Sequence, residues 1–222
     1  MKSKRKTIVG CNCLVGETYD DDNYVSVDLD FFQGFYRSVD CFVDLLDTIH
    51  HRGIRDVILE PNHDILELLP RKRRLAGITV WNIDLHDDCA WGPRGSMLHI
   101  ANWGTHIQRE KARLIWIRPG NEGVECSDSK ERSARASIAP RDTIVFDASD
   151  SRAFWWRNLP WNIKRVAVFI SRPFFHDRKD LYALLWALFD KWQDLDRTIN
   201  GKSLRDWSLL DFFNLVSSST ET

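Results

Sequence analysis

The residues best suited to chemistry in this sequence are an aspartate, a histidine and a second aspartate at alternate positions, Asp84, His86 and Asp88. An apolar run from Leu75 to Val80 leads into them, which predicts a buried strand that ends in polar side chains. In an extended chain alternate residues point to one side, so these three side chains begin on one face. Two carboxylates and an imidazole are costly to bury without a counter-charge, and a divalent cation supplies one. The pattern predicts a metal site; the alternative is a surface turn with solvated acids.

A second pair of carboxylates, Asp28 and Asp30, follows another predicted strand over residues 24–27. Both acids have apolar neighbours, and Phe31 and Phe32 come directly after them, so the segment is expected to be buried. Like charges that are buried together need a cation. The alternative is an amphipathic strand with two exposed acids.

A histidine, His63, follows a third predicted strand at residues 56–59. Pro61 disfavours a helical conformation at Glu60, so the chain is expected to leave the strand as a loop before a short helix over residues 64–69. In open α/β sheets ligands bind outside the carboxyl ends of the strands. All three groups of polar residues are predicted to lie at such ends.

The elements that must position these residues alternate between strands and helices. This alternation predicts one α/β domain over residues 1–222, with three α/β/α layers and a mostly parallel sheet. Residues 121–141 are polar and are expected to form an exposed loop, and 217–222 a disordered tail. Helices are predicted over 36–51, 64–69, 177–195 and 203–213, a helix or loop over 96–108, and further strands over 7–15, 113–117, 143–146 and 165–170.

Composition favours a globular protein, with 43% hydrophobic and 28% charged residues among 222. The net charge of -1 offers no electrostatic case for binding nucleic acid or a membrane. No apolar run is long enough to span a membrane, and the basic N-terminus makes a poor signal peptide. Five scattered cysteines indicate free thiols in a reducing compartment, so a cytoplasmic location is expected. The oligomeric state is left open.

Taken together, these motifs resemble the metal-ligand set of the arginase-like ureohydrolases, which carry two manganese ions on an α/β/α fold. The local sequence at 60–64, 83–88 and 101–103 is similar to the UPF0489 family, which includes peptide arginases. The resemblance covers roughly residues 24–118 and, more weakly, 170–173. It implies a hydrolase that converts arginine side chains of a ribosomal precursor peptide to ornithine and urea, using water activated between two manganese ions.

The resemblance also implies roles for individual residues. One ion would be held by His63, Asp84, Asp88 and Asp28, and the other by His86, Asp84, Asp28 and Asp30. Four carboxylates match the charge of two divalent ions, and an oxygen-rich set without cysteine suits manganese. His106 is the first choice for proton shuttle and His99 the second, Glu60 would bind the guanidinium or orient His63, and Asn102 and Trp103 would contact substrate.

One departure from the family is the order of the motifs. In arginases the pair of alternate aspartates comes late in the chain, whereas here Asp28 and Asp30 come first and the segment after 166–170 reads Ser171-Arg172-Pro173. Either the strand order is permuted or the pair is not a ligand set. Two other functions also fit: a different di-metal amidine or amide hydrolase, such as a deacetylase-like enzyme, or a non-catalytic metal-binding protein.

Overall fold

The structure is a computed structural model, and it describes residues 6–9, 22–33, 38–61, 68–69, 75–89, 102–119, 142–146, 159–171, 177–195, 197–208, 210–212 and 214. The strands are β1 (Lys6–Val9), β2 (Asp22–Asp28), β3 (Asp56–Glu60), β4 (Ile78–Ile83), β5 (Arg113–Pro119), β6 (Asp142–Phe146), β7 (Ile163–Phe169), β8 (Thr198–Ile199) and β9 (Lys202–Ser203). The helices are α1 (Ser38–His51), α3 (Trp103–Arg109) and α5 (Arg178–Asp194), with 3-10 turns η1 (Leu29–Phe32) and η4 (Leu204–Asp206).

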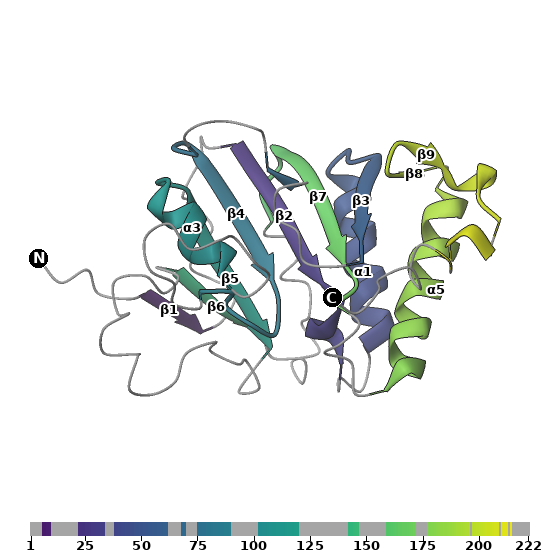
Figure 1. Cartoon of the computed structure of the whole chain (residues 1–222), viewed down its shortest axis with the longest axis horizontal. Helices are drawn as coiled ribbons and strands as arrows, with labels where there is room; N and C mark the ends of the chain where they lie inside the picture. The colour runs from purple at the N-terminus through teal and green to yellow at the C-terminus, as the bar shows by residue number, and fades with distance from the viewer. Residues whose placement is uncertain are drawn as a thin grey trace, which may run out of the picture.

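Within the described residues these nine strands form one sheet in the order β1-β6-β5-β4-β2-β7-β3-β8-β9 (Figure 1). All neighbouring strands are parallel except the short β8–β9 hairpin. Parallel strands with intervening helices confirm the predicted α/β class and mostly parallel sheet.

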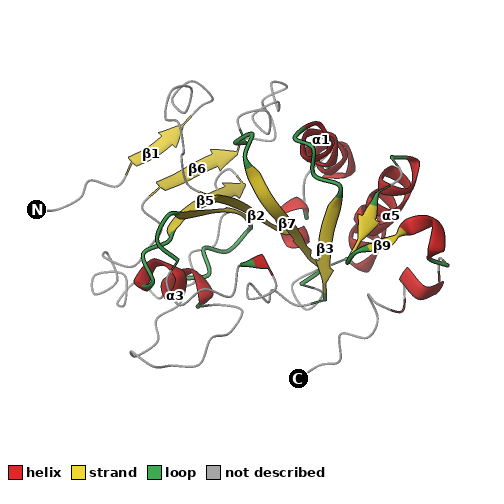
Figure 2. Ribbon diagram, turned by 90° about the horizontal axis from the view of Figure 1, so that it is seen from above, coloured by secondary structure: helices red, strands yellow, loops and turns green. Residues whose placement is uncertain are grey.

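Helices cover both faces of this sheet, and alternate residues of each strand face opposite cores (Figure 2). On one face Val25, Val27 and Ile83 pack with α1 and α5. On the other face Tyr24 and Val80 pack with α3. β2 and β4 are buried on both faces, and their apolar residues alternate with the buried polar residues Asn23, Ser26, Thr79 and Asn82.

The connections diverge between β2 and β4. The chain leaves β2 through α1 on one face of the sheet, and it leaves β4 toward α3 on the opposite face. Yet β2 and β4 are hydrogen-bonded neighbours, with Val27 opposite Ile83. Such a change of face is the topological switch point at which α/β sheets open a crevice for ligands.

Several predicted elements are found with shifted ends. The strand predicted over 75–80 runs from Ile78 to Ile83 instead, because Leu75 and Gly77 form a turn in which Gly77 has φ 79° and Ile78 N–H donates to Leu75 O. The helices predicted over 36–51 and 177–195 are confirmed as α1 and α5. The helix predicted for 64–69, apart from 68–69, the loop 121–141 and the tail 217–222 lie outside the described residues.

The helix predicted over 203–213 is wrong. In this segment β9 ends at Ser203, Leu204–Asp206 form the 3-10 turn η4, residues 207–208 are not helical, and α-helical residues are described at 210–212 and 214. Two contacts explain the difference. The turn residue Asn200, with φ 53°, lets the chain fold back, and its side-chain amide pairs with both Leu59 N–H and Leu59 O, which docks the hairpin on β3. Further on, Ser208 and Asp211 form a capping arrangement that starts a helix after Ser208.

No helix in the described part of the chain is long and apolar enough to cross a membrane.

Candidate metal centre

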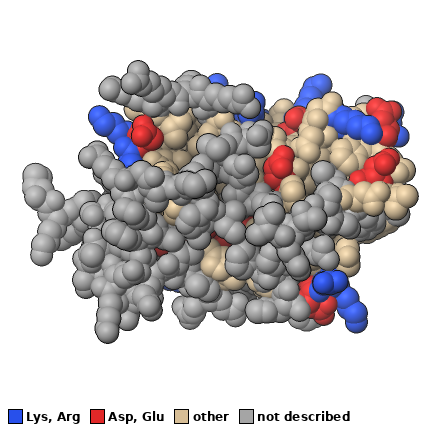
Figure 3. All heavy atoms as spheres, viewed as in Figure 1, with Lys and Arg blue, Asp and Glu red and all other residues tan. Residues whose placement is uncertain are grey.

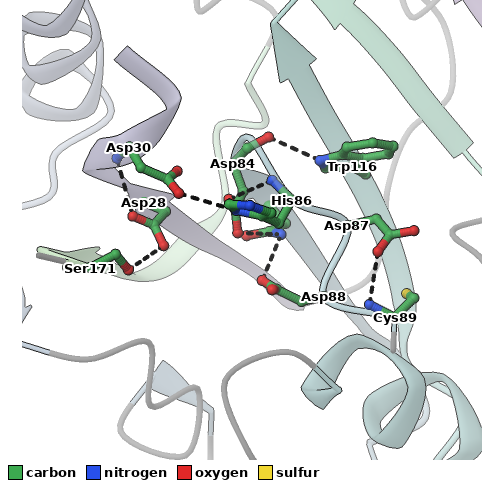
Figure 4. Close-up of polar contacts among 10 residues, drawn as sticks. Asp28, Asp30, Asp84, His86, Asp87, Asp88, Cys89, Trp116 and Ser171 are labelled. Atoms are coloured by element: carbon green, nitrogen blue, oxygen red, sulfur yellow. Dashed lines mark hydrogen bonds and ion pairs between the residues drawn. The ribbon is translucent and has the colours of Figure 1, made fainter. Parts of the chain in front are cut away.

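The two aspartate motifs meet at the carboxyl edge of the sheet. Asp28 is the last residue of β2, and Asp84 directly follows β4, the strand beside it. Asp30 lies in η1 just beyond β2, and His86 in the loop beyond β4, so their side chains approach from the two neighbouring strands (Figure 4). Segments more than fifty residues apart in the chain thus contribute to one cluster. This convergence is what a ligand-set interpretation of Asp28 and Asp30 requires.

Three of these residues form a group that could hold a metal ion. Asp30, Asp84 and His86 each offer one ligand atom, and these atoms lie within 4.8 Å of one another. His86 Nδ1 is 3.1 Å from Asp30 Oδ2 and 3.6 Å from Asp84 Oδ1. The two aspartates are almost fully buried, while the His86 side chain keeps 22% of its surface exposed. An ion here would therefore be reached from the side of His86.

Asp84 is the most firmly held of the three. Its Oδ1 accepts from His86 N–H at 2.8 Å, and its Oδ2 accepts from Asn82 Nδ2 at 3.3 Å. Its backbone N–H donates to Ile117 O at 3.1 Å, and its carbonyl accepts from Trp116 Nε1 at 3.0 Å. Ile117 and Trp116 of β5 thus anchor the backbone of Asp84, so the orientation of its carboxylate does not depend on an ion.

Asp28 is held by two donors. Its Oδ1 accepts from Asp30 N–H at 3.2 Å, which caps η1, and its Oδ2 accepts from the hydroxyl of Ser171 just after β7. Ser171 has φ 45°, a left-handed conformation that is unfavourable for serine. The strained backbone aims the hydroxyl at Asp28, and strain of this kind is concentrated at functional sites.

Asp88 has a left-handed backbone as well, with φ 48°. Its Oδ2 lies 3.5 Å from Asn82 Nδ2, and its carbonyl accepts from Gly104 N–H at 2.9 Å. The loop that carries Asp88 is therefore packed against the start of α3. A β-carbon at Gly104 would approach Asp88 O to 2.9 Å, so this close packing depends on glycine.

Burial and neighbouring charges shift the pKa values of Asp30 and His86. Burial raises the pKa of Asp30 well above its usual range, the charges of Asp28 and Asp84 raise it further, and the hydrogen bond with His86 opposes this. Burial alone lowers the pKa of His86, but contacts with Asp30 and Asp84 outweigh it and raise the pKa to about 10. In the absence of metal, a protonated His86 thus supplies the positive charge that the carboxylates need.

The donor set fits a hard divalent cation. Asp30 Oδ1 has no hydrogen-bond partner among the described residues, although the side chain is completely buried, and Oδ2 contacts His86 Nδ1. Buried carboxylates are normally hydrogen-bonded or bound to metal. The group offers carboxylate oxygens and one imidazole and no thiolate, a set that could hold a divalent metal ion.

The other predicted site residues are placed less centrally. Glu60 is the last residue of β3. Phe169 of β7 pairs with Glu60 on one side and with Asp28 on the other, so Glu60 and Asp28 lie level with each other on the same face of the sheet. Two strand spacings separate them, roughly 10 Å. His106 is half-buried on α3. Asn102 and Trp103 are buried at the start of α3, so neither presents its side chain at the molecular surface. His63 and His99 lie outside the described residues.

Two residues of the centre were not recognised in the sequence, Asn82 and Ser171. Asn82 stands two residues before Asp84 in a strand, so the period of two could have placed it on the ligand-bearing face. Ser171 carries no such local signal, because its contact with Asp28 spans 143 positions.

Charges elsewhere are mixed. On the face of the molecule seen in Figure 3, Lys and Arg are interspersed with Asp and Glu among the described residues, in keeping with the net charge of -1.

Comparison of the chain with family models, with curated proteins and with solved structures found no match.

Proposed function

We propose that the chain is a metal-dependent hydrolase that converts arginine side chains within a peptide to ornithine and releases urea. The observation that supports this most is the meeting of Asp28 and Asp30 with Asp84, His86 and Asp88 at the switch point of the sheet. In such a sheet this crevice is where ligands bind. Here it holds the residue types that the resemblance to arginase-like ureohydrolases implies.

On this proposal, the strand order is permuted relative to the family. The pair Asp28 and Asp30 comes from β2, early in the chain, yet β2 lies directly beside β4, which carries the other motif. A site is defined by where side chains converge rather than by their order along the chain. The adjacency of β2 and β4 supports this interpretation.

The residues would hold two manganese ions. Asp30, Asp84 and His86 would hold the first ion. Asp28, whose Oδ1 accepts from Asp30 N–H, would be a ligand shared by both ions. Asp88 and His63 would complete the ligand set of the second ion. Two such ions would supply a nucleophile at neutral pH by lowering the pKa of water. Because Asp28 and Asp84 are hydrogen-bonded independently of metal, they would fix the position of that nucleophile.

The remaining roles concern the substrate. Glu60 is a candidate for binding the guanidinium, since a carboxylate accepts it in a bidentate way, and it lies at the same edge and on the same face as Asp28. It could instead orient His63. His106 and then His99 are the proposed proton shuttles. A peptide, unlike free arginine, is bound through contacts spread along a groove, so internal arginine is the expected substrate.

The test is mass spectrometry of peptides incubated with manganese-loaded protein. Conversion removes CH2N2 from each arginine, and urea release from free arginine is measured alongside. We expect internal arginine to react far faster than free arginine, and Asp28→Ala to abolish turnover while the protein remains folded. A free-arginine preference would overturn the peptide assignment. Reaction of acetyl-lysine peptides instead would favour a deacetylase-like hydrolase, and manganese binding with no turnover would favour a binding protein.

A further inference from the structure

A buried amide lies beside the acidic cluster and belongs to none of the proposed ligands. Asn82 is inside β4, two residues before Asp84, and its side chain is completely buried. Its chain neighbours Trp81 and Ile83 are apolar and face the opposite core. A polar side chain in the middle of a buried strand is unfavourable unless its hydrogen bonds are satisfied, so its presence calls for a reason.

The amide nitrogen of Asn82 joins two carboxylates. Nδ2 lies 3.3 Å from Asp84 Oδ2 and 3.5 Å from Asp88 Oδ2. The amide oxygen, in contrast, has no hydrogen-bond partner among the described residues. The contacts of the nitrogen are therefore retained at the expense of a buried, unsatisfied acceptor. Such an arrangement is expected where the orientation of the carboxylates matters more than stability.

We infer that Asn82 is a positioning residue that ties the loop carboxylate of Asp88 to the strand carboxylate of Asp84, and so sets the affinity of the second metal ion. The inference rests on the proposed function in assuming two ions. Donors that orient ligating carboxylates tune metal affinity even though they do not touch the metal.

The effect should differ between the two ions. Asp84 keeps its contacts with the N–H of His86 and with Trp116 and Ile117 when Asn82 is changed. The group of Asp30, Asp84 and His86 therefore survives. Asp88 is not part of that group; it lies in the loop after β4 with φ 48°, and its carboxylate accepts from the Asn82 amide at 3.5 Å. Loss of the amide should weaken the ion that Asp88 helps to hold and leave the other nearly unchanged.

The experiment uses the full chain with Asn82→Leu, which keeps the branched arrangement of heavy atoms and removes the donor. Asn82→Ala is the second variant, should leucine prevent folding. The matched control is Asn23→Leu. Asn23 is also an asparagine and is completely buried near the amino end of the neighbouring strand β2, where it hydrogen-bonds with Trp81 and Asn162, neither of which is an acidic residue of the centre. Circular dichroism establishes folding before any titration.

Manganese binding is then measured by calorimetry, and the spin coupling between the two ions by electron paramagnetic resonance. In the Asn82 variants we expect the manganese affinity of the second step of the titration to weaken about 10–100-fold. The affinity of the first step should stay within about threefold of wild type. The spin-coupled signal should be lost at the manganese concentration at which wild type shows it. Asn23→Leu should shift the melting temperature only.

The outcomes separate this inference from the proposed function. If wild type binds two ions and the Asn82 variants bind both as tightly, or lose both equally, the positioning role is rejected while the hydrolase proposal stands. A folded wild-type chain that binds no manganese would reject the proposed function and this inference with it.

Discussion

At the scale of single residues, the centre shows how side chains that bind no metal prepare those that do. Ser171 is the simplest case, since one hydroxyl donates to Asp28 Oδ2 from a left-handed backbone. The hydrogen bond removes part of the rotational freedom of the carboxylate before any ion arrives. Ligands fixed in this way bind metal more tightly because less entropy is lost on binding.

Ser171→Ala should therefore weaken manganese binding by about 10–100-fold, because Asp28 Oδ2 loses the hydroxyl donor. Calorimetric titration measures this. Ser171→Gly is the informative companion, because glycine adopts φ 45° without strain but also lacks the hydroxyl. Glycine should restore stability and leave metal affinity low. If affinity returns with glycine, the backbone rather than the hydroxyl is what matters.

His86 makes metal binding depend on pH. Its pKa of about 10 means that the imidazole is protonated at neutral pH in the metal-free protein, and manganese must displace that proton. The apparent affinity for the ion that His86 would hold should rise about tenfold per pH unit between about pH 6 and 8, with about one proton released when that ion binds. The sign follows because the proton competes more strongly at low pH.

Calorimetry in buffers of different ionisation enthalpy counts the released protons. His86→Asn is the control, since it keeps a polar side chain that cannot take up the proton and should show a shallower dependence on pH. A pH-independent affinity in wild type would mean that His86 is not displaced, and so is not a ligand.

At the scale of elements, α3 restrains the loop that carries Asp88. Gly104 N–H donates to Asp88 O, and a β-carbon at Gly104 would lie 2.9 Å from Asp88 O, from Cys89 Sγ and from Leu114 Cδ2. Two of these atoms belong to the loop after β4 and one to β5. The helix can approach the loop this closely only because glycine occupies the position.

Gly104→Ala should destabilise the protein by about 1–3 kcal/mol through overpacking, and weaken the ion that Asp88 helps to hold. Urea unfolding and manganese titration measure the two effects. Gly77→Ala provides the comparison: it introduces strain at φ 79°, but nothing lies within 4 Å of its β-carbon and it is not in the centre. It should cost about 1–2 kcal/mol and leave metal affinity unchanged. Equal metal affinities in both variants would contradict the role of α3.

At the scale of the whole molecule, the centre joins three strands that sequence keeps far apart. Asp28 comes from β2, Asp84 follows β4, and Ser171 follows β7. Burial, and then the repulsion of Asp28 and Asp84, raise the pKa of Asp30 where these strands meet. A bound cation would remove this repulsion and link the strands, so metal binding should stabilise the entire fold.

Manganese at about 100 times its dissociation constant should raise the free energy of unfolding by about 2.7 kcal/mol for each independent site. Thermal unfolding with manganese and with a chelator measures the difference. Asp30→Asn should melt higher than wild type without metal, because a buried charge is removed, and should gain less from manganese. A wild-type melting temperature that does not respond to manganese would count against a metal centre.

Much of the element pattern follows from the sequence alone, because it depends on local periodicity. The amphipathic spacing in α5 and the apolar runs of β2 and β4 specify which residues are buried, whatever lies beside them. The expectation that polar residues lie where these strands end is met at Asp28 and Asp84. Where long-range contacts compete, as in the docking of Asn200 on Leu59, the local pattern mispredicts a helix over 203–213.

Only the tertiary structure decides which strand ends meet. The sequence order leaves it open whether the pair Asp28 and Asp30 can reach the D-x-H-x-D motif, and the pairing of β2 with β4 brings them together. The same pairing of distant strands puts the hydroxyl of Ser171 on Asp28. Strand order and register are set by burial of the whole sheet between its two cores, which is a property of the folded chain and not of any segment.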